Sequence, residues 1–184
     1  MATRAHSKEF LEVWEMFQET SRQFKEIEKR FKDTDKKFQN TEKLISSLTS
    51  KWGRFVEGLI APAVVRIFGE RNIAVDKVYQ RVRARKNGSG MEVDILAIDG
   101  EYAVLIEAKS TLTVSDVKEH LDRLAKFKTY FPEYRDRKVV GAVAGIVIDE
   151  NADRYAYQKG LFVITESGDT VAFLNNKKFV PKTW

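Results

Sequence analysis

An apolar side chain recurs at every seventh position from Phe10 to Trp52, and this spacing strongly limits how the segment folds. The residues of this first series are Phe10, Phe17, Phe24, Phe31, Phe38, Ile45 and Trp52. A second series follows three positions behind it, at Val13, Thr20, Ile27, Thr34, Thr41 and Leu48. Because no glycine or proline interrupts the stretch, the pattern predicts one long helix with the apolar seam of a coiled coil.

The seam is too narrow for one helix to bury by itself, so we expect a homo-oligomer formed with further copies of the chain. A parallel dimer is favoured, although phenylalanine in the first series with threonine in the second leaves trimers and tetramers open. Alternatively, the helix folds back onto its own chain. The pattern divides the chain into a coiled-coil oligomerisation helix at 1–51 and a second domain at 52–184.

The second domain contains two short charged segments, at 92–94 and 107–109, each inside an apolar, strand-like run. Asp99-Gly100 between the runs is a strong signal for a two-residue hairpin turn, which would set Asp94 opposite Leu105. Side chains alternate faces along a strand. We therefore expect four charged side chains on one face: Glu92, Asp94, Glu107 and Lys109.

Three carboxylates this close repel one another, and on a half-buried face each costs on the order of several kcal/mol to desolvate unless it is paired. A divalent cation would relieve the repulsion, and an all-oxygen site suits Mg²⁺ or Mn²⁺. Such an ion beside a lysine fits the hydrolysis of phosphodiesters. Alternatively, the charges are simply solvated on an exposed hairpin, but strands apolar on both faces indicate a covered position.

Asp94, a spacer and then Glu107-Ala108-Lys109-Ser110 resemble the motif of the PD-(D/E)XK nuclease superfamily over residues 52–150. The resemblance implies an α/β fold with a restriction-endonuclease-like core: a helix, a three-strand meander, a helix and a further strand. It also implies that Asp94 and Glu107 bind metal, that the Ala108 carbonyl adds a ligand, and that Lys109 is catalytic. Val93 departs from the pattern, because it stands where the motif has proline. The helix after the motif also lacks the glutamine and tyrosine of one subgroup.

Glu57 matches a glutamate that many members of this superfamily supply from the first helix. It shares a helix face with Gly53 and Ala61, whose small side chains would permit close approach to a sheet. Alternatively, Glu57 is a solvated helix residue. Glu92 is a further candidate ligand for the metal.

Three arginines, Arg81, Arg83 and Arg85, alternate with Val82 and Ala84 in a predicted strand at 75–86. They are expected to point the same way and could follow a row of phosphates on a nucleic acid. Alternatively, they protect an exposed strand edge.

Local signals predict the remaining elements. These are a helix at 52–68 that is kinked or restarted at Pro62, a turn at 87–90, a helix from a capping box at Thr113 to Pro132, a strand at 138–148, a helix at 152–158 and a hairpin of 161–165 with 170–174. His120 is expected on the surface of the helix that follows Thr113.

Composition narrows the function. The chain has no cysteine, which excludes thiolate chemistry, and no apolar run long enough for a membrane span, so a cytoplasmic protein without a membrane partner is expected. Its net charge of +5 suits a polyanionic partner. The expected function is that of a Mg²⁺- or Mn²⁺-dependent nuclease, a phosphodiesterase with DNA as the expected nucleic acid. The alternative is a non-catalytic nucleic-acid-binding or assembly module built on the coiled coil.

Overall fold

The computed structural model describes residues 8–168 and 170–184. Residues 1–7 of the predicted arm and Asp169 of the predicted turn at 166–169 lie outside the described residues. By packing, the chain divides into two units, with the boundary between Thr49 and Ser50.

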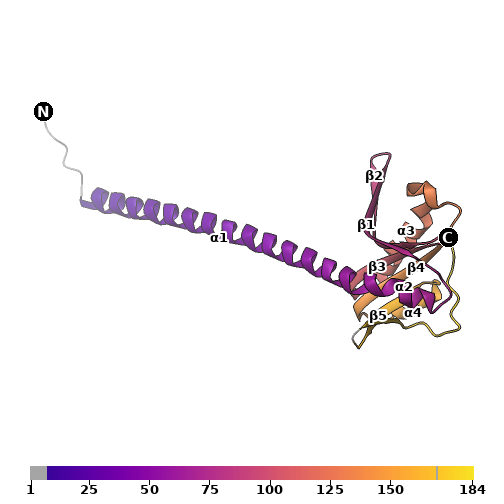
Figure 1. Ribbon diagram of the computed structural model, residues 1–184. Helices are drawn as coiled ribbons and strands as arrows, with labels where there is room; N and C mark the ends of the chain where they lie inside the picture. The colour runs from indigo at the N-terminus through magenta and orange to yellow at the C-terminus, as the bar shows by residue number, and fades with distance from the viewer. Residues whose placement is uncertain (1–7, 169) are drawn as a thin grey trace. The chain divides into compact units, whose positions relative to one another are not determined.

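The first unit consists of a single helix, α1 (Lys8–Ile60), which also continues into the second unit. Figure 1 shows α1 as one uninterrupted helix, as the seven-residue repeat predicts. The predicted boundary at 51/52 therefore falls inside a helix and not in a linker. Every side chain from Phe10 to Thr49 is exposed, and Phe31 in the seam is 76% exposed. Assembly through this seam stays a prediction.

The second unit follows with alternating helices and strands. Its elements after α1 are η1 (Ala61–Ala63), α2 (Val64–Gly69), β1 (Lys77–Lys86), β2 (Ser89–Ile98), β3 (Tyr102–Leu112), α3 (Val114–Tyr130), η2 (Pro132–Tyr134), β4 (Lys138–Ile148), α4 (Ala152–Gln158), β5 (Phe162–Ser167) and β6 (Thr170–Phe173). The interruption predicted at Pro62 is confirmed, because α1 gives way there to a short 3₁₀ turn. The capping box at Thr113 is also confirmed, with Asp116 as its second member.

One six-stranded sheet holds the second unit together, in the spatial order β1-β2-β3-β4-β5-β6. The first three strands form an antiparallel meander, β4 and β5 run parallel to β3, and β6 is antiparallel to β5. The predicted α/β class with a long N-terminal helix is therefore confirmed. No helix among the described residues has the length and apolar character needed to span a membrane.

Helices cover both faces of the sheet, which gives three layers. On one face, α2 and the last turns of α1 pack Val56, Ile60 and Phe68 against sheet residues such as Ile95 and Ile106. Against the other face, the helices α3 and α4 pack their apolar residues on a second set from the strands, among them Leu96, Leu105 and Val143. Strands that are apolar on both faces are buried on both, so the acidic residues on β2 and β3 sit in covered strands.

The loop between β2 and β3 is longer than predicted. Ile98 pairs with Ala103 and three residues, 99–101, connect the strands, so the predicted two-residue turn at Asp99-Gly100 is wrong. The Asp99 carboxylate accepts hydrogen bonds from the main-chain N–H groups of Glu101 (2.8 Å) and Tyr102 (2.6 Å), which closes the wider loop. This moves the pairing by two positions relative to the prediction.

The alternation of faces along β1 and β2 changes at Arg81 and Asp94. Arg81 has a φ of 54°, and it and Asp94 are skipped in a ladder that pairs Gln80 with Ile95 and Val82 with Val93. Ile95 packs on the α1 side of the sheet, whereas Val93 packs on the α3 side. Strict alternation would place both side chains on one side. The side of the sheet to which odd-numbered residues of β2 point therefore changes between Val93 and Ile95.

Because the second unit has its own two-sided core, we predict that it folds without the arm. A chain of residues 50–184 should unfold cooperatively, with a Tm close to that of the full chain. A chain of residues 61–184 is the matched control, since it lacks the buried Val56 and Ile60, each worth about 1.5–3 kcal/mol of burial. Thermal unfolding followed by circular dichroism would measure both. A 50–184 chain that is unfolded, or a 61–184 chain as stable as it, would contradict the two-unit division.

Candidate functional site

Asp94 lies at the point where β2 leaves β3. The ladder between these strands ends at Ile95 with Ile106. One residue further, the Asp94 carboxylate accepts a hydrogen bond from the main-chain N–H of Ala108 at 3.0 Å. The side chain thereby takes the place of the β2 main chain as the partner of the Ala108 N–H, while Ala108 stays paired with Ala144 of β4. Asp94 and the segment Glu107-Ala108-Lys109 are brought together, as the sequence analysis expects.

Glu107 is 3% exposed and carries two ion pairs. Its Oε1 lies 3.0 Å from the Lys109 Nζ, and its Oε2 lies 2.6 Å from an Arg123 guanidinium nitrogen supplied by α3. Lys109 in turn lies 3.6 Å from Asp116, in the first turn of α3. Both oxygens of the buried carboxylate are thus neutralised by cations of the same chain.

Glu57 reaches the site region from the last turns of α1. It is 6% exposed and not solvated, and both of its oxygens accept hydrogen bonds from Arg81, each at 2.9 Å. The Glu57 charge contributes to raising the pKa of Asp94, which places the two carboxylates in the same electrostatic environment. Of the small residues noted on either side of Glu57, Gly53 lies on α1 and Ala61 begins η1.

Glu92 does not share the face of Glu107 and Lys109, and that expectation is wrong. Its neighbours Met91 and Val93 pack on the α3 side, so Glu92 points away from α3, whereas Glu107 points toward it. Glu92 is instead paired with Arg83 through hydrogen bonds of 3.0 and 3.2 Å. The reason is the change of faces at Arg81, which the alternation rule does not include.

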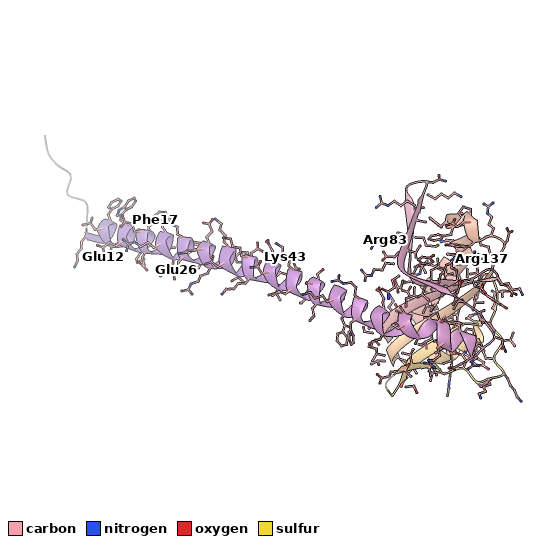
Figure 2. All side chains as sticks on the ribbon, in the orientation of Figure 1. Glu12, Phe17, Glu26, Lys43, Arg83 and Arg137 are labelled. Carbon is pink, nitrogen blue, oxygen red and sulfur yellow. The ribbon has the colours of Figure 1, made fainter. Side chains whose placement is uncertain are left out.

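The predicted row of arginines is partly engaged within the chain. Arg81 and Arg83 hold Glu57 and Glu92 in the ion pairs described above, while Arg85 lies near the tip of the β1–β2 hairpin and is exposed. Figure 2 shows Arg83 on that hairpin. The Arg83 side chain is 67% exposed, so it could exchange Glu92 for a phosphate at small cost. Binding of nucleic acid by these arginines stays a prediction.

His120 is buried at 2% exposure, and its expected surface position is wrong. Its Nε2 lies 3.2 Å from the Leu105 carbonyl oxygen, to which it donates, and its Nδ1 has no hydrogen-bond partner among the described residues. Burial, with the charge of Arg123, lowers the pKa of His120 to about 3. The imidazole is therefore neutral throughout the physiological pH range.

Three residues of α3 that the sequence analysis did not assign to the site line it: Asp116, His120 and Arg123. They follow one another at spacings of four and three, which places them on one face of a helix. The spacing is visible in the sequence. It could be assigned to the buried face of the helix only once α3 was known to lie over β3.

The acidic side chains could hold a metal only with rearrangement. Among residues 8–168 and 170–184, no three acidic or histidine side chains are grouped as a metal site. The donor types fit Mg²⁺ or Mn²⁺, because Asp94 and Glu107 offer carboxylate oxygens. Asp94 takes part in none of the ion pairs among the described residues. Glu107 would have to release Lys109 or Arg123 to bind a cation.

Asp94 is the electrostatically unbalanced member of the group. Burial is the main cause that raises its pKa, from 3.8 to about 6, and the neighbouring Glu107 and Glu57 carboxylates add to the effect. The Ala108 N–H and Lys109 act in the opposite direction and only partly offset it. A cation placed beside Asp94 would remove this imbalance.

The raised pKa predicts a pH-dependent stability. Between about pH 4 and pH 6 the unfolded chain loses the Asp94 proton before the folded chain does, so ionisation of Asp94 lowers the free energy of unfolding as pH rises. Asp94→Asn keeps an oxygen for the Ala108 N–H and removes the charge. Without divalent metal, it should be more stable than wild type by about 1–2 kcal/mol at pH 7.5, after allowing for residual solvation, and nearly equal to it at pH 4.

Urea denaturation at the two pH values would measure this difference. Asp122→Asn, on an exposed position of α3, is the matched control and should differ from wild type equally at both pH values. A gap between Asp94→Asn and wild type that does not grow from pH 4 to pH 7.5 would contradict the electrostatic account of the site.

Comparison with known proteins gives the chain a family. No curated protein and no solved structure matches it. Residues 65–173, which hold β1 to β6 and the segments that carry Asp94, Glu107 and Lys109, match the family described as a domain of unknown function, DUF8196. This match spans more than half of the chain, so the chain belongs to the DUF8196 family.

Proposed function

We propose that the chain is a metal-dependent phosphodiesterase that cleaves nucleic acid, with DNA as the expected substrate. The observation that carries the proposal is the hydrogen bond from the Ala108 N–H to the Asp94 carboxylate. It joins an aspartate on β2 to a Glu-Ala-Lys segment on β3 at the place where the two strands separate. Asp94 and Ala108, 14 positions apart in sequence, are in contact there.

The strand topology supports the same proposal. A helix leads into the β1–β2–β3 meander, α3 follows, and β4 then pairs parallel with β3. This is the order of elements that the resemblance to PD-(D/E)XK nucleases implies. A restriction-endonuclease-like core is thus part of the proposal.

Asp94 and Glu107 would hold the metal, with the Ala108 carbonyl as the third ligand that the resemblance implies. When bound, Mg²⁺ neutralises phosphate oxygens and lowers the pKa of a bound water. Asp94 fits this role because it is half-buried, carries no ion pair among the described residues and has a raised pKa. Glu57 would assist from α1, where its charge bears on Asp94.

Lys109 would act as a cation in the reaction. Burial lowers its pKa, but Glu107, Asp116 and Asp94 outweigh burial, so the pKa is raised overall and the amine is protonated at neutral pH. A protonated lysine stabilises negative charge on a phosphate or orients the attacking water. This favours charge stabilisation over removal of a proton from the water by Lys109.

A second candidate function is a non-catalytic nucleic-acid-binding or assembly module. The observation that favours it is the internal neutralisation of two acidic residues, since Glu107 is paired with Lys109 and Arg123, and Glu57 with Arg81. Carboxylates balanced by protein cations need no metal. Such a protein would bind nucleic acid through Arg83 and Arg85 without cleaving it.

Cleavage of plasmid and single-stranded DNA in the presence of Mg²⁺ or Mn²⁺ distinguishes the two functions. Wild type should cleave, and Lys109→Ala should lose activity by about 100-fold or more, as expected on removal of a charge-stabilising group. Lys126→Ala, an exposed lysine on α3, is the matched control and should keep full activity.

The metal itself is tested by thermal unfolding with and without Mg²⁺. Binding to the folded state should raise the Tm of wild type, and Asp94→Asn should lose most of this shift. If wild type neither cleaves DNA nor gains stability from Mg²⁺ or Mn²⁺, the binding module is the correct reading.

A further inference from the structure

We propose that residues 10–52 of α1 form a parallel, in-register coiled coil with the same segment of a second copy of this chain. In heptad notation, the first seven-residue series occupies position a and the second occupies position d. Position e follows d directly, and position g precedes a directly. The proposed contacts involve α1 alone and do not depend on the proposed function.

The repeat length itself calls for a partner. An α-helix has 3.6 residues per turn, so on a straight helix a strict seven-residue repeat drifts sideways by about 20° per heptad. The repeat here holds from Phe10 to Trp52 without an insertion. Two helices that wind around each other with a left-handed twist keep such a seam in contact throughout.

The threonines at position d do not prevent burial of the seam. Each hydroxyl donates to the carbonyl four residues earlier on its own helix: Thr20 to Met16 at 2.8 Å, Thr34 to Arg30 at 2.8 Å and Thr41 to Lys37 at 2.9 Å. A buried hydroxyl is costly only when its hydrogen bond is missing. With that bond made internally, threonine enters the seam without an unsatisfied donor.

The charges beside the seam favour the parallel orientation. Position e is acidic at Glu28, Asp35 and Glu42, whereas position g carries Gln23, Arg30 and Lys37 over the same heptads. In a parallel pair, each g residue faces the e residue five positions later on the other copy. Arg30 of one copy then faces Asp35 of the other, and Lys37 faces Glu42.

An antiparallel pair would bring like charges together. In that arrangement, e positions face e positions and g positions face g positions. Glu28, Asp35 and Glu42 would lie opposite one another, as would Arg30 and Lys37. The charge pattern therefore selects against this orientation.

Ion pairs within the single helix do not compete strongly with these contacts. Arg30 lies 2.6 Å from Glu26 and Lys32 lies 2.7 Å from Glu28, but all four side chains are exposed. Exposed pairs of this kind contribute little to stability. Figure 2 marks Glu26, Phe17 and Lys43 along the same helix. Arg30 and Glu28 can thus turn toward a second copy at little cost.

Disulfide trapping tests the orientation, and the chain suits it because it contains no cysteine. Thr20→Cys and Thr41→Cys place one thiol at a d position near either end of the seam. In a parallel, in-register pair each variant should cross-link to itself on mild oxidation, and the full-length protein should have the mass of two chains by light scattering. Lys43→Cys, at position f on the outer face, is the matched control and should stay uncross-linked.

Three outcomes would overturn the proposal. One is a monomer or a trimer in light scattering at tens of micromolar. Another is self-cross-linking of Lys43→Cys to the same extent as Thr41→Cys. The third is cross-linking only when Thr20→Cys and Thr41→Cys are mixed, which is the result of an antiparallel pair.

A charge exchange tests the flanking contacts. Arg30→Glu with Lys37→Glu makes g acidic, and Asp35→Lys with Glu42→Lys makes e basic. Each double variant alone should lose association by at least tenfold, because both charged cross-helix pairs, those of positions 30 with 35 and 37 with 42, become repulsive. An equimolar mixture should regain it as a heterodimer, which also shows that each variant folds. Unchanged self-association of both variants would show that these charges do not contact a second copy.

Discussion

The hydrogen bond between the Ala108 N–H and the Asp94 carboxylate fixes the point at which the sheet opens. Beyond Ile95, β2 stays paired with β1 but no longer with β3. A buried main-chain N–H left without a partner would cost about 1–3 kcal/mol, and the carboxylate removes that cost. The same contact takes Asp94 out of the regular alternation of side chains along β2 and brings it close to Glu107. The candidate site thus results from the hydrogen bond that satisfies the Ala108 N–H where β2 and β3 separate.

Charge balance decides how the site behaves. Glu57 and Glu107 are neutralised by Arg81, Lys109 and Arg123, which lie on three different elements, whereas Asp94 stands outside these pairs. In each pair the carboxylate is buried and the cation is only half-buried, and removing the cation would leave a buried charge unpaired, so the two paired carboxylates are held in place. Asp94 is left to take up a proton or a cation. The difference between a nuclease and a binding module therefore rests on what compensates this one carboxylate.

The two units differ in how their apolar side chains are buried. Residues 50–184 cover both faces of their sheet with their own helices. The helix of the first unit keeps its apolar seam exposed, and its polar seam residues are satisfied internally. The second copy that we propose as its partner has a seam of the same period and complementary flanking charges. Association would then be a property of the arm, and the site a property of the second unit alone.

Local signals in the sequence determined the long helix, the interruption at Pro62, the capping box at Thr113 and the helix at 152–158, because each depends on contacts between residues a few positions apart. The approach of Asp94 to the segment Glu107-Ala108-Lys109 was also predicted from sequence. It holds although the predicted register was two positions off, because the Asp94 carboxylate reaches the Ala108 N–H just beyond the end of the ladder. Tertiary structure alone decided the face of Glu92, which follows from the change of faces at Arg81 and its positive φ. It also decided the burial of His120 and the ion pair of Arg123 with Glu107, because both result from the packing of α3 over β3. Those contacts join residues far apart in the chain, and no short-range pattern of side chains specifies them.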